Sequence, residues 1–66
     1  MKITEQTYRK TLNRMLDDEQ AGIKAYKKLL LSLPVNPEAN KVRSIISGII
    51  RDEEQHEKLL LRLLYF

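Results

Sequence analysis

The sequence contains no cysteine, so disulfide bonds and thiolate metal sites are excluded. It has only two glycines and two prolines, which favours soluble helices over a disordered or fibrous chain. No apolar run is long enough to span a bilayer, and the first residues lack the apolar stretch of a signal peptide. We therefore expect a cytoplasmic protein that does not enter the membrane.

The chain is short, and its charge is mixed rather than concentrated. Its 66 residues allow one domain, and a lone chain of this length buries too little apolar surface to be comfortably stable. The formal charge of +3 is compatible with nucleic-acid binding, but the 12 basic residues are interleaved with nine acidic ones instead of forming a patch. We expect no nucleic-acid partner.

The first helix is predicted over residues 5–33. Thr4 is a suitable N-cap, and Ile3 and Tyr8 have the spacing of a hydrophobic staple across the helix start. Pro34 disfavours the helical conformation in the residue before it, so the helix should end there.

The second helix is predicted over residues 37–64. Asn36 is its expected N-cap, Pro37 suits the first helical position, and Glu38 places negative charge in the first turn. Because the connection spans only residues 34–36, the two helices must be antiparallel neighbours. The predicted fold is an all-α, antiparallel two-helix hairpin that forms a single domain over residues 1–66.

Each predicted helix carries a stripe of residues separated by alternating steps of four and three, which is typical of a helix face that packs against a partner. Polar residues interrupt both stripes, so Glu19, Glu53 and His56 are predicted at core positions. The first stripe is Leu12, Leu16, Glu19, Ile23, Tyr26, Leu30 and Leu33, and the second is Val42, Ile46, Ile49, Glu53, His56, Leu60 and Leu63.

Two leucine-rich clusters, within residues 29–31 and 59–64, are apolar on more than one side of their helices. A single hairpin cannot cover them, which predicts a homodimer or a larger even-numbered assembly. Gly22 and Gly48 lie inside the predicted helices, where each costs about 1 kcal/mol relative to alanine. We interpret both as points of close helix approach, in preference to a role in ligand access.

The two carboxylates at core positions should lie close together. Counted from the turn at about 1.5 Å per residue, Glu19 and Glu53 come level to within one helical turn, and His56 follows Glu53 on the same face. One helix thus offers a glutamate and the other a Glu-x-x-His pair, which is half of the di-metal carboxylate pattern of four-helix bundles. A two-fold dimer would complete the pattern.

A metal pair would balance the charge of such a site. Four carboxylates from two chains would repel one another in a dry core, whereas two divalent cations neutralise them and gain two imidazole ligands. Ligand oxygen and nitrogen without sulfur favour iron or manganese first, with zinc as a further option. The sequence therefore predicts two metal ions per dimer, bound by Glu19, Glu53 and His56.

These residues also carry a resemblance to a known family. The Glu19-x6-Tyr26 spacing, followed by Glu53-Glu54-Gln55-His56, resembles the ferritin-like superfamily, and the two-helix length makes the chain most similar to encapsulated ferritins. The resemblance covers nearly the whole chain but rests on four diagnostic positions. The resemblance implies a dimeric four-helix bundle with a di-iron site and ferroxidase activity, which is the activity of an oxidoreductase.

The resemblance further implies roles for individual residues and partners. Glu19, Glu53 and His56 would be the iron ligands that carry the catalysis, and Tyr26 would contact a ligating carboxylate. An encapsulin shell is the implied partner, although the sequence ends in Leu-Leu-Tyr-Phe without a segment that resembles a targeting tail.

Two other functions stay open. The first is a metal-free dimeric interaction module, in which the buried glutamates and His56 form a polar network that fixes helix register. The second is a basic helical hairpin that binds nucleic acid, which only the net charge favours.

Overall fold

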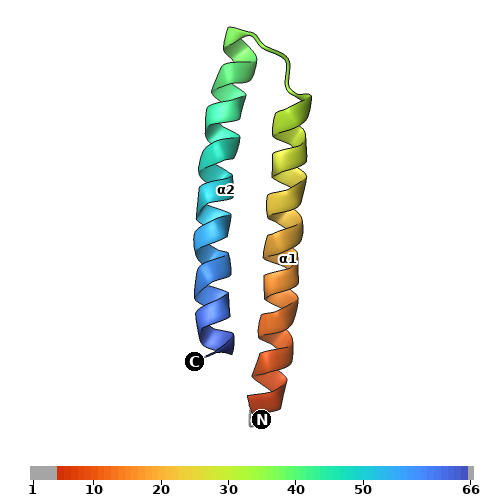
Figure 1. Ribbon diagram of the computed structural model, residues 1–66, viewed down its shortest axis with the longest axis vertical. Helices are drawn as coiled ribbons and strands as arrows, with labels where there is room; N and C mark the ends of the chain where they lie inside the picture. Colours follow the sequence, from red (N-terminus) through yellow and green to blue (C-terminus); the bar gives the residue numbers. More distant parts are fainter. Residues whose placement is uncertain (1–4, 66) are drawn as a thin grey trace.

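The computed structural model consists of two long antiparallel helices that lie side by side and are joined by one short turn (Figure 1). It describes residues 5–65, with side chains from residue 8 onward. Helix α1 spans Glu5–Ser32 and helix α2 spans Pro37–Leu64, and no strand occurs within this part of the chain. The predicted all-α hairpin is confirmed. The expected N-cap at Thr4 and its staple with Ile3 lie outside the described residues.

The turn has the chemistry expected from its sequence. Helix α1 ends at Ser32, one residue earlier than predicted, because the proline at position 34 restricts Leu33. Helix α2 begins at Pro37, and the Asn36 side chain accepts a hydrogen bond of 2.7 Å from the amide of Ala39. This bond satisfies one of the free amides at the helix start.

Two arginines tie the ends of the helices together, a feature that local sequence patterns do not indicate. Arg43 of α2 donates hydrogen bonds to the carbonyls of Leu33 and Pro34, at 3.3 and 3.2 Å, just beyond the end of α1. At the other end of the hairpin, Arg9 of α1 donates a 2.9 Å hydrogen bond to the carbonyl of Leu64. Each guanidinium thus supplies positive charge where the carbonyls at a helix C-terminus leave negative potential.

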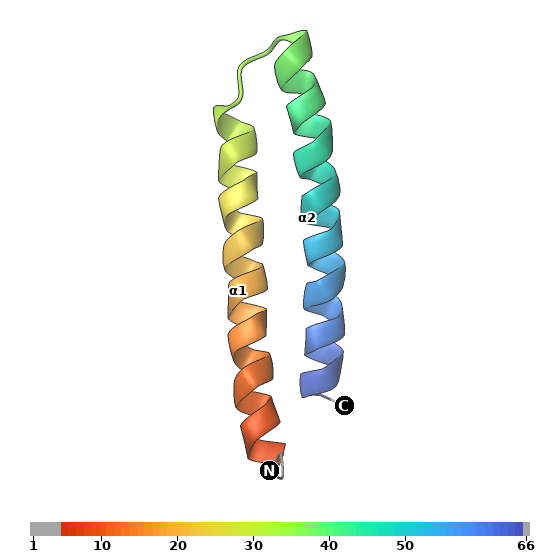
Figure 2. The ribbon, with the colours of Figure 1, turned by 180° about the vertical axis from the view of Figure 1, so that it is seen from behind.

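The core is a narrow line of contact between the helices. Ile23 of α1 packs with Ile46 and Ile50 of α2, and Tyr26, Leu30 and Leu33 pack around them. Leu16, Ala39 and Leu64 are the other buried apolar residues among those described. Seen from both sides, the helices form a single layer with no third element covering them (Figure 2).

The predicted stripe on α2 is only partly buried. Ile46 is buried as expected, but Val42 and Leu63 are exposed, and Ile50 and Leu64 take the buried positions instead. The cause is geometric: a stripe with a 3.5-residue period drifts around a helix with 3.6 residues per turn, and one neighbouring helix covers only part of its width. The uncovered part faces one side of the hairpin.

The two glycines differ in their surroundings. A methyl group on Gly22 would lie 2.9 Å from Oε2 of Glu53, whereas one on Gly48 would meet nothing within 4 Å. The predicted close helix approach is therefore wrong for Gly48. At Gly22 the close neighbour is a side-chain carboxylate rather than the backbone of α2.

No helix in the described part of the chain is both long enough and apolar enough to cross a membrane.

Candidate metal site

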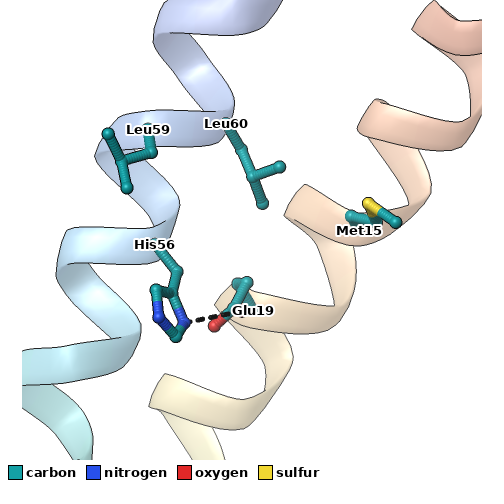
Figure 3. Close-up of a pocket in the computed structure, with 5 residues that line it drawn as sticks. All are labelled: Met15, Glu19, His56, Leu59 and Leu60. Carbon is teal, nitrogen blue, oxygen red and sulfur yellow. Dashed lines mark ion pairs between the residues drawn. The ribbon is translucent and has the colours of Figure 1, made fainter.

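The candidate site lies on one side of the hairpin, in an open pocket between the helices. Met15 and Glu19 line it from α1, and His56, Leu59 and Leu60 line it from α2 (Figure 3). Figure 3 shows Glu19 and His56 pointing toward one another across the gap, with the apolar side chains on the N-terminal side of Glu19 and the C-terminal side of His56. We call this side of the hairpin the open face.

Glu19 and His56 form the polar centre of the open face. Nδ1 of His56 lies 3.3 Å from Oε1 of Glu19, so the two form an ion pair when the imidazole is protonated. The Glu19 side chain is 22% exposed and that of His56 is 61% exposed. With Nδ1 turned toward Glu19, the other ring nitrogen, Nε2, is the one left to bind a further group.

The second oxygen of Glu19 is an exception to the usual pairing of buried polar atoms. Oε2 is buried and has no hydrogen-bond partner among the described residues. A buried carboxylate oxygen without a donor loses its hydration and gains nothing in return, which is why such atoms are rare in folded proteins. The atom therefore points to a missing donor or cation.

The carboxyl group of Glu53 lies beside Glu19, and its pKa is shifted by this neighbour. Its pKa is raised above the ordinary value of 4.5, first because a protonated Glu53 hydrogen-bonds with Glu19. Partial burial and repulsion from the Glu19 carboxylate raise the pKa further, and His56 partly offsets both. When both carboxylates are charged, neither can donate a hydrogen bond to the other.

The structure thus brings the three predicted ligands to one level of the hairpin, but not all at core positions. Glu19 and Glu53 are half-buried, whereas His56 is exposed, so the prediction that His56 occupies a core position is wrong for the single chain. His56 lies at the edge of the face that α1 covers, for the same geometric reason as Leu63.

Tyr26 is half-buried and packs against the isoleucine core. Two residues of the site were assigned no role there from sequence. Leu59 lines the pocket, and Gly22 lies against the Glu53 carboxylate. The spacing of Gly22, three residues after Glu19, is the one signal that placed it on the same helix face.

The candidate ligands of the hairpin do not converge on one point. Within the described residues, no three His, Cys, Asp or Glu side chains are grouped closely enough to hold one.

Comparisons with known proteins give no family assignment. No family model, curated protein or solved structure matches the chain.

Proposed function

We propose that two hairpins associate through their open faces into a four-helix bundle that binds two iron ions and oxidises Fe(II). The observation that carries the proposal is the buried, unpartnered Oε2 of Glu19 beside a second carboxylate with a raised pKa. Two-fold pairing of the open faces would bring two such clusters together, so that Glu19, Glu53 and His56 of both chains form one site.

The donor set fits a metal pair. Glu19 Oε2 has an unused lone pair in a half-buried position, Glu53 lies next to it, and the imidazole of His56 faces the same carboxylate. Divalent iron would supply an electron to oxygen or peroxide when bound, and manganese or zinc could occupy the same ligands. The similarity to the ferritin-like superfamily at Glu19, Tyr26, Glu53 and His56 supports iron as the first choice.

The residues of the chain have separable tasks in this proposal. The carboxylates of Glu19 and Glu53 would bind the metal cations and must be ionised to do so, so metal binding competes with protonation of Glu53, whose pKa is raised. His56 completes the ligand set as a neutral base. Met15, Leu59 and Leu60 around the pocket would exclude water from the site once a second chain covers them.

The test is iron oxidation by metal-free protein. Addition of Fe(II) in air should give oxidation faster than in buffer alone, saturating near two irons per dimer. Glu53→Ala and His56→Ala should each remove the acceleration. Asp17→Ala is the matched control, because Asp17 is an exposed acid that helical spacing places away from the open face. Wild-type rates in both site variants would refute the assignment.

A second function, the metal-free register network, is favoured by one observation. The Glu19–His56 pair joins the two helices and requires no metal. The two functions differ in the effect of Glu53→Ala on the metal-free dimer. If the residues form a register network, Glu53→Ala should destabilise the metal-free dimer. If they form a metal site, Glu53→Ala should not destabilise the metal-free dimer, because the substitution removes a repelling carboxylate.

A further inference from the structure

Gly22 of α1 lies directly against the Glu53 carboxylate of α2. A Cβ atom added there would lie 2.9 Å from Oε2, 3.6 Å from Cδ and 3.8 Å from Oε1 of Glu53. These three atoms are the carboxylate itself, and no backbone atom of α2 is among them. Gly48 offers an internal comparison, because a Cβ atom there would have open space around it.

We propose that Gly22 is a positioning residue: its missing side chain leaves the space in which the Glu53 carboxylate lies next to Glu19. Gly22 lies one helical turn after Glu19 on α1, and any larger residue at position 22 would intrude on the space that the Glu53 carboxylate fills. A glycine in the middle of a long helix is unfavourable by about 1 kcal/mol, and this clearance is the feature that offsets it.

The obstacle that an alanine would meet is mobile, so the substitution should move the carboxylate rather than unfold the hairpin. The end of a glutamate side chain can rotate away from a methyl group, whereas a helix backbone cannot. Gly22→Ala should therefore leave the helices in place and separate Glu53 from Glu19. The effect on metal affinity rests on the function proposed above, but the clearance itself does not.

The first experiment uses metal-free protein and a double-mutant cycle in stability. Gly22→Ala and Glu53→Ala should be non-additive, because the methyl group and the carboxylate compete for one space. Gly48→Ala and Glu53→Ala should be additive. In the same samples at a fixed pH of about 8, well above the ordinary glutamate pKa, the Glu53 carboxyl carbon resonance should shift in Gly22→Ala and stay in place in Gly48→Ala. Additivity in both cycles with an unmoved resonance would overturn the proposal.

The second experiment measures Zn(II) binding by calorimetry, since zinc adds no redox chemistry. Gly22→Ala should weaken Zn(II) binding by about tenfold or more, as expected when a ligand loses its support, and Gly48→Ala should not. In the Gly22→Ala background, Glu53→Asp should restore part of the affinity, because the shorter side chain withdraws the carboxylate from the new methyl group. In the wild-type background the same Glu53→Asp substitution should weaken binding.

The two experiments separate the failure of this inference from the failure of the proposed function. If wild-type protein shows no Zn(II) binding that depends on Glu53, the metal site is refuted while the double-mutant cycle still decides the role of Gly22. If Zn(II) binds and Gly22→Ala binds it with wild-type affinity, Gly22 has no positioning role.

Discussion

The open face should be the dimer interface. Truncation of Leu59, which lines its pocket, and of Leu63, one helical turn further along the same side of α2, tests this directly. Both side chains are just over half exposed in the hairpin, at 53% and 54%. Leu→Ala removes three carbons, each contributing about 0.8 kcal/mol when buried, so each truncation should remove roughly 1.2 kcal/mol of dimer burial. Two sites in two chains add to about 5 kcal/mol, which corresponds to a more than thousandfold weaker dimer.

Sedimentation equilibrium over a wide concentration range measures this loss. Alanine is the best helix former, so the double variant should retain its helix content while its dimer dissociates. Leu31→Ala is the control, because Leu31 is 89% exposed and lies on the opposite side of α1 from Gly22 by helical spacing. A monomeric wild-type protein would refute the shared site, and a double variant that dimerises as tightly as wild type would refute the choice of face.

Three further predictions concern the charge of the site, the turn and nucleic acid. The raised pKa of Glu53 favours folding below the ordinary value of 4.5, and this contribution is lost as pH rises through the raised pKa. Glu53→Gln, which can donate to Glu19 at every pH, should therefore stabilise metal-free protein at neutral pH and leave it closer to wild type in acid, as thermal melts across pH would measure. Asn36→Ala should cost about 1 kcal/mol in denaturant unfolding by removing the cap on Ala39, and an unchanged midpoint would contradict the role of that bond. Mobility shifts with DNA and RNA at physiological salt should show no tight binding, and strongly salt-dependent association would instead favour the basic hairpin.

The two helices and the turn were predictable because the residues that begin and end each helix act on their immediate neighbours in the sequence. Asn36 and Pro37 fix the start of α2 through a side-chain bond and a preset backbone angle, and Pro34 restricts the residue before it whatever surrounds it. The arginine contacts at both helix ends were not predictable. Arg9 bonds a carbonyl at the end of the other helix and Arg43 bonds a carbonyl in the turn, and the reach of a long flexible side chain leaves no periodic signal in the sequence.

The sequence predicted which residues form the site better than it predicted how deeply each of them is buried. The 3–4 spacing placed Glu19, Glu53 and His56 on the facing stripes. The residue count from the turn placed them at one level, because two antiparallel helices with a short turn have little freedom in register. The spacing could not separate the part of the stripe that α1 covers from the part that it leaves open, so the exposure of His56 was missed. The spacing also could not show which atoms of α2 approach Gly22, because its close neighbour is the end of the Glu53 side chain.

The hydrogen bonding of the Glu19 carboxylate distinguishes between a metal site and a metal-free register network, which share this geometry. A polar network that only fixes register is stabilising when every buried polar atom has a partner, and a half-satisfied network is worse than an apolar core. In the hairpin, Oε1 of Glu19 faces His56 while Oε2 has no donor, and the nearby Glu53 carboxylate adds repulsion instead of a hydrogen bond unless it is protonated. Two-fold pairing of the open faces would add a second unpaired Glu19 oxygen, and His56 is the one side-chain donor among the residues that line the pocket. A divalent cation would satisfy both oxygens and both carboxylates at once, so the unpaired atom favours the metal site over the network.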